Sequence, residues 1–267
     1  MQASAPAHLP KVELRHVDLR YFGVSGETEA LRDISLAVSA TEFVAVIGQS
    51  GCGKSTLLSL ISGILAPTGG VVLIDGQPVT GPTRKVGYML QQDCLFEWRT
   101  ILDNAVLGAE IQGADMRRAK ERASQLLTRY GLGQFLHHLP RELSGGMRQR
   151  VALARTLTTD PDVVLLDEPF SALDSQTRIA LADEVAEILR RERKTAILVT
   201  HDIGEAISMA ERVIVLSRRP GQVKSNHTVR FASAGEARPP PLAARNTPEF
   251  NAYFKTLWQE LEVHVEG

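Results

Sequence analysis

The sequence predicts an α/β fold with a mainly parallel core sheet, and three observations lead to this fold class. Short apolar runs rich in branched residues alternate with helical patterns along most of the chain. A glycine-rich turn separates the apolar run 43–47 from the helical pattern 55–64. A second apolar run, 163–166, leads directly into two acidic residues. Strands of a parallel sheet are buried on both faces, so continuous apolar runs of this kind are typical of such a sheet.

The expected elements alternate along the chain. Strands are predicted over the apolar runs 12–14, 34–38, 43–47, 71–74, 163–166, 196–200 and 213–216. Helices are predicted over 55–64 and 179–193, where apolar residues recur on one side. The segment from about 92 to 150 lacks strand signals and is predicted to be a helical insertion, with Leu126 and Leu127 facing its core.

Charge and composition exclude several classes of protein. The 267 residues carry a formal net charge of −1, which gives no overall attraction to nucleic acid or to anionic lipid. Two cysteines, Cys52 and Cys94, are too few for a disulfide framework. No apolar run approaches the roughly 18 to 20 residues of a membrane-spanning helix, and the N-terminus lacks a signal-peptide pattern. We therefore expect a cytosolic chain that reaches a membrane only through a partner.

The tail differs in composition from the rest of the chain. Residues 231–246 contain three consecutive prolines with alanine and arginine, which predicts a stiff, extended linker. Thr247 and Pro248 are typical of an N-cap and a first helical position, so a helix is predicted over 247–263. Its apolar residues recur at helical spacing. This stripe predicts that the helix docks on its own domain or on a neighbour.

The strongest local motif is the glycine-rich turn, which reads G-x-x-x-x-G-K-S. Its glycines allow backbone N–H groups to converge on phosphate oxygens, and the following helix directs the positive end of its dipole at the same anion. Lys54 would reach the β- and γ-phosphates, and the Ser55 hydroxyl would bind Mg²⁺. A chance glycine-rich loop is the alternative, but the flanking strand and helix favour phosphate binding. The predicted binding residues are Gly48, Gln49, Ser50, Gly51, Cys52, Gly53, Lys54, Ser55 and Thr56.

A second acidic element stands at the end of the apolar run 163–166. There, Asp167 and Glu168 would lie at the carboxyl end of a strand, where α/β sheets bind their ligands. Asp167 is predicted to hold Mg²⁺, directly or through water, and Glu168 to polarise the attacking water as a general base. Alone, this pattern could be an ordinary strand end; together with the phosphate loop it indicates a nucleotide site.

The segment Leu143-Ser144-Gly145-Gly146-Met147-Arg148-Gln149-Arg150 resembles the signature motif of ATP-binding cassette (ABC) ATPases. Met147 stands where that motif usually has glutamine, a variation also found in nitrate- and sulfonate-type importers. Other sites follow in the family's order. They are an adenine-stacking aromatic (Tyr21, or Phe22 beside it), a Q-loop glutamine (Gln91, with Gln92 adjacent), a D-loop (Ser171-Ala172-Leu173-Asp174) and a switch histidine (His201).

The resemblance runs from about residue 12 to residue 229 and implies a P-loop NTPase of the ABC type. The implied architecture is a nucleotide-binding domain over 11–230, with an N-terminal antiparallel β subdomain and a helical subdomain (about 92–150) that carries the signature. ATP and Mg²⁺ are the implied cofactors. The implied catalytic residues are Glu168, His201, Gln91 and Lys54, and the implied metal ligands are Ser55, Gln91 and Asp167.

The signature also implies a dimer. Ser144, Gly145 and Gly146 open a helix, so their backbone donors form a second anion site. In the family this site faces the γ-phosphate bound by the opposite subunit, with Leu143, Met147 and the D-loop Asp174 nearby. Two identical chains would therefore bury two ATP molecules between them, closed with ATP and open after hydrolysis.

A single cassette without a membrane span resembles the ATPase subunit of a bacterial importer, peripheral on the cytoplasmic face of the inner membrane. Its implied partners are two transmembrane permease subunits and an extracytoplasmic solute-binding protein; no nucleic acid is expected. The motifs resemble the nitrate, sulfonate and taurine branch, although Glu97 stands where that branch usually has proline. Phe96 and Trp98 are expected either to form a docking groove for the permease or to pack the insertion. An exporter subunit and a non-transport ABC ATPase remain the alternatives.

Cys52 leaves two possibilities open. A thiol beside a phosphate loop and a helix N-terminus could be acidic and sensitive to alkylation. It could equally be a small residue that fits the loop.

Overall fold

The computed structural model describes residues 9–23, 26–171, 173–234 and 238–261. Its strands are β1 (Val12–Gly23), β2 (Gly26–Val38), β3 (Phe43–Ile47), β4 (Gly69–Ile74), β5 (Gln77–Pro78), β6 (Val86–Met89), β7 (Val163–Asp167), β8 (Thr195–Thr200), β9 (Arg212–Leu216) and β10 (Val223–Thr228). Its α-helices are α1 (Lys54–Ile61), α2 (Ile101–Ala105), α3 (Leu107–Ile111), α4 (Met116–Arg129), α5 (Gly145–Thr158), α6 (Ser175–Arg191), α7 (Ile203–Met209), α8 (Pro241–Ala244) and α9 (Pro248–Leu261). Short 3-10 helices cover Gly133–Phe135, Pro140–Glu142 and Ala232–Ala234.

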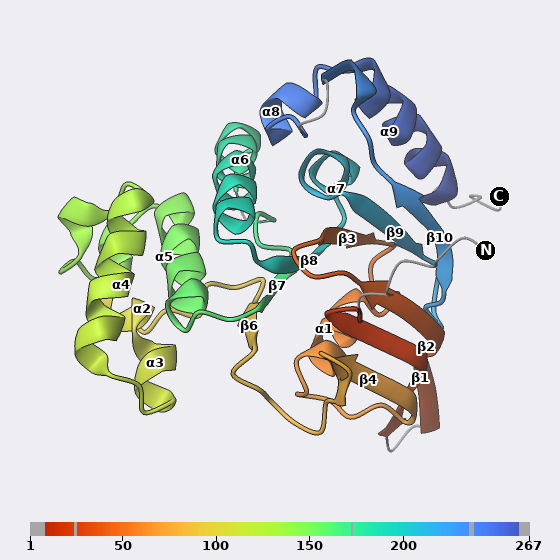
Figure 1. Cartoon of the computed structure of the whole chain (residues 1–267), viewed down its shortest axis with the longest axis horizontal. Coiled ribbons are helices and arrows are strands. Elements are labelled where there is room, and N and C mark those ends of the chain that lie inside the picture. Colours follow the sequence, from red (N-terminus) through yellow and green to blue (C-terminus); the bar gives the residue numbers. More distant parts are fainter. Residues whose placement is uncertain (1–8, 24–25, 172, 235–237, 262–267) are drawn as a thin grey trace, which may run out of the picture.

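Two sheets form the framework. The core sheet has the strand order β10-β9-β3-β8-β7-β6, and its pairs are parallel except for the antiparallel pair of β10 with β9. The second sheet has the order β2-β1-β4-β5 and is antiparallel (Figure 1). The predicted α/β class with a mainly parallel core sheet and an antiparallel β subdomain is confirmed.

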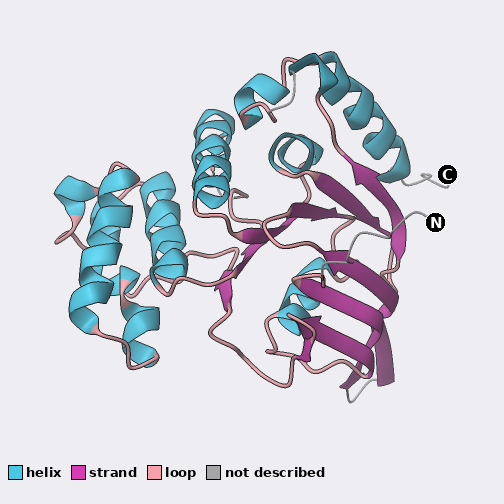
Figure 2. Cartoon of the chain, viewed as in Figure 1, coloured by secondary structure: helices cyan, strands magenta, loops and turns pink. Residues whose placement is uncertain are grey.

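Alternate residues of β3 face two different cores. Phe43, Ala45 and Ile47 join the apolar cluster that includes α6, α7 and the tail helices. Val44 and Val46 join a second cluster, formed with α1 and the antiparallel sheet. The core sheet is therefore covered on both faces, which explains why its central strands are continuous apolar runs (Figure 2).

Helices α2 to α5 stand together as a helical unit to one side of the core sheet, away from the antiparallel sheet (Figure 1). Leu126 and Leu127 of α4 are buried there, as predicted. The unit is attached to the framework at two places: the loop after β6 leads into it, and α5 leads out of it toward β7. The loop after β6 passes the carboxylate pair at the end of β7, since Gln91 Nε2 donates to Glu168 Oε2 (3.4 Å). The connection from α5 enters β7 at its other end, at Val163.

Several elements differ in extent from the sequence prediction. The strands expected at 12–14 and 34–38 extend to Val12–Gly23 and Gly26–Val38, because their outer parts form a long antiparallel hairpin with polar, exposed residues. The polar strand β10 was not predicted for the same reason. The helix expected over 55–64 ends at Ile61; Gly63 follows with φ +78°, a turn conformation that glycine adopts without strain.

The tail departs from the expected extended linker. Residues 241–244 form the short helix α8, whose Leu242 N–H donates to Asp183 of α6 (2.7 Å), so an extended linker is wrong for this part. The tail helix α9 begins at Pro248, and the Thr247 hydroxyl accepts from the Phe250 N–H as an N-cap (3.3 Å). Residues 262 and 263 of the expected helix lie outside the described residues.

Helix α9 docks on its own chain through only part of its apolar stripe. Phe250 and Leu257 are buried, whereas Phe254 and Trp258 are exposed. At its C-terminal end, Glu260 pairs with His227 of β10 (3.0 Å). None of the helices within the described ranges is both long enough and apolar enough to cross a membrane.

Candidate active site

The phosphate loop connects β3 to α1, as the motif predicts. Gly51 and Gly53 have φ values of +75° and +107°, which L side chains rarely adopt. At Gly53 and Gly48 space is also limiting: a Cβ would lie 2.6 Å from Leu31 Cδ2 and 2.6 Å from Cys52 Sγ, respectively. The glycines are therefore required both by the backbone conformation and by close packing.

Lys54 lies within this loop. Its side chain is buried, and its ammonium donates to the carbonyl oxygens of Gly48 (2.9 Å) and Gln49 (3.1 Å). The loop residue Gln49 is bound from outside as well: its amide donates to the Leu261 carbonyl at the end of α9 (3.2 Å) and accepts from Arg218 Nε (3.0 Å). The loop thus surrounds a buried cation at the N-terminus of a helix, an arrangement suited to anions.

Ser55 and Asp167 meet across the gap between α1 and β7. The Ser55 hydroxyl donates to Asp167 Oδ1 (3.0 Å), and the Tyr88 hydroxyl of β6 donates to Oδ2 (3.1 Å). Burial raises the pKa of Asp167 above its usual value, although these two hydrogen bonds act in the opposite direction. The side-chain oxygens of Ser55 and Asp167 are hard donors of the type that Mg²⁺ prefers. Tyr88 was missed because nothing in a strand pattern indicates where a phenol hydroxyl will bind.

Glu168 is half-buried and lies between two polar side chains. His201 Nδ1 is 3.1 Å from Glu168 Oε2, and Gln91 Nε2 donates to the same oxygen at 3.4 Å and to the Ser171 hydroxyl at 3.4 Å. Glu168 itself adopts a left-handed backbone conformation (φ +45°), and its N–H donates to the Val199 carbonyl (2.8 Å). A non-glycine residue in this conformation is uncommon and is associated with functional sites. The geometry gives a carboxylate with fixed partners next to the Ser55–Asp167 pair.

Tyr21 reaches the same region from the antiparallel sheet. It is 44% exposed, and its hydroxyl lies 3.3 Å from the Thr56 hydroxyl in the first turn of α1. The alternative aromatic, Phe22, is 75% exposed on the same strand. The structure therefore brings the Tyr21 hydroxyl to the phosphate loop, whereas its neighbour Phe22 faces solvent.

The signature segment lies at the start of α5 in the helical unit. Leu143 is buried, Met147 packs against the apolar core, and Ser144 is the N-cap of α5, accepting from the Met147 N–H at 3.4 Å. Gly146 packs closely on α6, where a Cβ would lie 3.0 Å from Thr177 Cγ2. In the described part of the chain, no hydrogen bond or ion pair joins the signature residues to the phosphate loop.

The D-loop leads into α6 beside the signature. Asp174 is the N-cap of α6 and accepts from the Thr177 N–H (3.0 Å) and the Gln176 N–H (3.1 Å). Hydrogen bonding to Thr177, through its side chain first and then its backbone, and to Gln176 lowers the pKa of the Asp174 carboxyl. Gly145 is also near this loop, since a Cβ there would lie 3.7 Å from Leu173 Cδ2. Ala172, the second residue of the motif, lies outside the described residues.

Two further side chains resolve alternatives. Cys52 is buried, and this burial raises the pKa of its thiol, so the hypothesis of an acidic thiol is wrong. Phe96 and Trp98 stack with ring centroids 4.8 Å apart, and Trp98 is 76% exposed. The interpretation that Trp98 packs the helical insertion is therefore wrong. An aromatic pair, with Trp98 exposed and Phe96 half-buried, stands beside the Q-loop.

Comparison with known proteins agrees with this geometry. Residues 31–171 match the family described as ABC transporter. The chain is 45% identical to the uncharacterized ABC transporter ATP-binding protein YtlC of Bacillus subtilis (strain 168), over 92% of this chain and 94% of that protein. It is 41% identical to the taurine import ATP-binding protein TauB of Yersinia pestis bv. Antiqua (strain Antiqua), over 84% and 88% of the two chains.

Solved structures give the same result. The dimeric, post-hydrolysis structure of the ATP-binding cassette MJ0796 bound to ADP and Pi superposes with a TM-score of 0.73. Its sequence is 33% identical to this chain, and the match covers 82% of this chain and 99% of that one. With the phosphate loop, the acidic strand end and these matches in agreement, the chain belongs to the ABC transporter family, as an ATP-binding subunit whose ATP hydrolysis is coupled to transport.

Proposed function

We propose that the chain is the energy-coupling subunit of a bacterial ABC importer that takes up a small oxyanion or related solute, such as nitrate, taurine or another sulfonate. The support for import is the 41% identity to a protein named as a taurine import subunit. The motif with Met147 in the signature points to the same branch. The transported solute would contact the membrane subunits and a solute-binding protein rather than this chain.

The observation that carries the enzymatic part is the environment of Glu168. Its carboxylate has His201 and Gln91 as neighbours within 3.4 Å, and Glu168 comes directly after Asp167, the last residue of β7. In the proposed mechanism Glu168 accepts a proton from the attacking water, while His201 and Gln91 orient this water and the γ-phosphate. Lys54 stabilises the negative charge that develops on the phosphate oxygens.

The metal and nucleotide would be held by residues already close together. Ser55, Asp167 and, across the site, Gln91 would hold Mg²⁺; when bound, this ion would neutralise charge on the β- and γ-phosphates. Backbone N–H groups of Gly48 to Thr56 would bind the phosphates. Tyr21 would stack on the adenine, since its half-exposed ring lies beside the first turn of α1.

The second half of each site would come from a second copy of this chain. The signature residues Leu143 to Met147 begin a helix whose first N–H groups are anion donors. Ser144 and Gly145 are exposed, so this helix start is accessible to an ATP held by a partner. We propose a two-fold dimer with two ATP molecules between the chains.

We propose that residues 11–230 form the nucleotide-binding domain, with about 92–150 as its helical subdomain. The stacked Phe96–Trp98 pair, of which Trp98 is exposed, would receive a helix of the permease. This contact would hold the chain at the cytoplasmic face of the inner membrane. Trp98 also lines a groove, together with Arg99, Asp103, Met116 and Lys120. This groove is suited to a helix with both apolar and charged residues.

The test of the catalytic part is Glu168→Gln, which keeps the size of the side chain and removes its basicity. Hydrolysis of ATP should fall at least about 100-fold, because general-base catalysis typically contributes this much. The variant should also elute as an ATP-bound dimer in sizing chromatography. Turnover at the wild-type rate without a dimer would contradict the assignment of Glu168.

The test of the import part uses the complete complex. The chain should co-purify with two permease subunits from membranes, and a Trp98→Ala variant should lose this association while its own ATP hydrolysis is retained. The ATPase activity of the complex should rise with a solute-binding protein loaded with taurine or nitrate. Stimulation by a solute added on the ATPase side, without any binding protein, would favour an exporter.

A further inference from the structure

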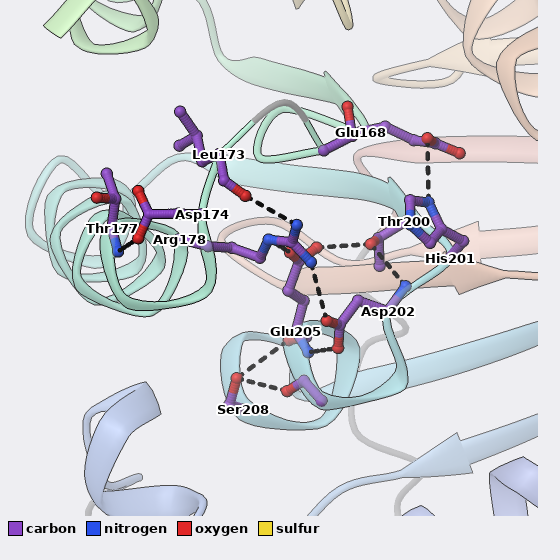
Figure 3. A network of polar contacts seen from close by, with 12 residues as sticks. Glu168, Leu173, Asp174, Thr177, Arg178, Thr200, His201, Asp202, Glu205 and Ser208 are labelled. Atoms are coloured by element: carbon purple, nitrogen blue, oxygen red, sulfur yellow. Dashed lines mark hydrogen bonds and ion pairs between the residues drawn. The ribbon is translucent and has the colours of Figure 1, made fainter. Parts of the chain in front are cut away.

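Arg178 of α6 lies between the D-loop and the turn that carries His201. Its Nη2 donates to the carbonyl oxygen of Leu173 in the D-loop (3.0 Å), and its Nη1 lies 3.5 Å from Asp202 Oδ2 (Figure 3). Its Nε, which is buried, lies 3.9 Å from Glu205 Oε1. One guanidinium therefore contacts both the D-loop, at Leu173, and the turn that carries His201, at Asp202.

The turn around His201 is held on both sides by the same network. Asp202 accepts from the Glu205 N–H (3.0 Å) as the N-cap of α7, and its own N–H donates to the Thr200 hydroxyl (3.0 Å). The Thr200 hydroxyl in turn donates to Glu205 Oε2 (2.6 Å). The residues before and after His201 are thus bound to groups that contact Arg178, while the imidazole itself points to Glu168 (Figure 3).

The placement of Arg178 is suited to transmitting position. The guanidinium is planar and presents its donors in a rigid fork, so a shift of the Leu173 carbonyl changes the geometry of the ion pair with Asp202. The side chain of Glu205 is 4% exposed, so water competes little for its contact with Arg178; the side chain of Asp202 is 30% exposed. The backbone N–H of Arg178 also makes the first helical bond of α6, to the Asp174 carbonyl (2.9 Å), which fixes its stem.

We propose that Arg178 is a positioning residue that couples the D-loop to the switch histidine. When the D-loop is fixed by closure of the dimer, the Leu173 carbonyl and Asp202 share Arg178 in the arrangement seen here, and His201 is held against Glu168. When the D-loop moves away, this restraint on the His201 turn is released. The inference rests on the proposed roles of Glu168 and His201 and adds a residue that acts through them.

The experiment compares three variants of the full chain. Arg178→Met keeps the aliphatic stem and removes all donors, whereas Arg178→Lys keeps a charge that can reach one acceptor but not both. Arg122→Met is the matched control: Arg122 of α4 also donates to a backbone carbonyl (Leu157, 3.2 Å) and pairs with a carboxylate (Asp160, 2.8 Å), in the helical unit. Steady-state hydrolysis, thermal unfolding and ATP-dependent dimer formation are measured for each.

Arg178→Met should lower kcat by about tenfold or more while the KM for ATP changes less than about twofold, because misplaced catalytic groups reduce the chemical step. Like Glu168→Gln, it should accumulate the ATP-bound dimer. Arg178→Lys should recover part of kcat. Arg122→Met should have a Tm similar to that of Arg178→Met but the kcat of the wild type.

A second readout does not depend on activity. In protein labelled with ¹⁵N-histidine, the imidazole signal of His201, assigned by its loss in His201→Ala, should shift in Arg178→Met and not in Arg122→Met. An unchanged His201 signal with normal kcat would overturn the inference, as would a fall in kcat matched by a raised KM and a Tm lower than that of the control. If Glu168→Gln hydrolyses ATP normally, the proposed function fails instead, whatever Arg178→Met does.

Discussion

The phosphate loop and the signature segment are both glycine-containing helix starts, but they differ in how completely the chain satisfies their polar groups. At the phosphate loop, Lys54 and Asp167 are each 7% exposed, and both are hydrogen-bonded within the chain. At the signature, Ser144 is exposed, and its hydroxyl accepts one long hydrogen bond, 3.4 Å, from the Met147 N–H of its own helix. One helix start is built into the core, and the other is displayed on the surface.

This difference indicates that the phosphate loop is preorganised within one chain, whereas the signature is left to bind a ligand held elsewhere. Buried charged groups must be paired to be tolerated, so the phosphate-loop side is fixed before any ligand arrives. The signature side is held by Leu143 and Met147, which pack in the core, by its packing on α6, and by the ion pairs of Arg148 with Asp93 and Glu97. Its first residues, Ser144 and Gly145, stay exposed. Its exposed N–H groups are available to a ligand that the same chain does not bring to them.

The strongest test of this comparison mixes two defective chains. Lys54→Ala should abolish phosphate binding on the buried side. Ser144→Asp keeps an N-cap but places a negative charge where a γ-phosphate would bind. Each variant alone should hydrolyse ATP at least about 100-fold more slowly than the wild type. An equimolar mixture should recover about a quarter of the wild-type rate, because half of the dimers pair one intact loop with one intact signature.

The control is each variant alone at the total protein concentration of the mixture, which should stay inactive. If each chain used its own signature, the mixed dimers would contain no intact site and no activity would return. That result would show that the exposed signature does not complete the ATP site of a second chain.

A smaller effect, on the pH dependence of stability, is expected from Glu205, a buried carboxyl in α7. Burial is the largest cause of its shift and raises its pKa to about 7; Asp202 adds to this, whereas Thr200, Arg178 and His201 act against it. The folded chain therefore keeps a proton that the unfolded chain loses near pH 4.5. The free energy of unfolding should fall by about 3 kcal/mol as the pH rises through this window, and should change no further on this account above pH of about 7.

Glu205→Gln carries no titrating group, so this part of the pH dependence should vanish. Urea unfolding at several values between pH 5 and pH 8 measures the difference between the variant and the wild type. The variant should gain stability relative to the wild type as the pH rises. A constant difference across this range would show that Glu205 is ionised at all of these pH values.

The smallest effect is expected from the signature cap. Ser144→Ala should lower the free energy of unfolding by about 0.5 kcal/mol, because the hydrogen bond to Met147 is long and exposed. Thr100→Ala, which removes the shorter cap of α2 to the Asp103 N–H (3.1 Å), should cost about 1 kcal/mol. Denaturant unfolding measures both. A larger loss from Ser144→Ala would mean that the signature serine is needed for folding rather than kept for a ligand.

The sequence predicts the buried framework best. Strand β3 has the bounds that its apolar run indicated, and β7 differs by one residue, because strands covered on both faces have continuous apolar sequences. The long hairpin of β1 and β2 was underestimated, since polar residues alternate on its exposed face. Helix α8 was missed because three prolines favour an extended segment, whereas here one proline opens a helix that packs on α6.

The residues of the candidate site also fall into those that the sequence predicted and those that it did not. Residues named by a motif, such as Ser55 and Asp167, are brought together because the ends of α1 and β7 meet at one edge of the sheet. Tyr88 and Arg178 were missed, since their contacts depend on distances across the fold rather than on spacing in the chain. Only a structure shows which hydroxyl or guanidinium reaches a carboxylate.

The exposed indole of Trp98 has a practical consequence for spectroscopy. The chain has only two tryptophans, and Trp98 is 76% exposed beside the groove where we expect the permease. With Trp258 replaced by phenylalanine, the remaining indole would be a native fluorophore at that surface. Its emission should move to shorter wavelength when a membrane helix covers it, so assembly of the transporter could be followed in real time without attached dyes.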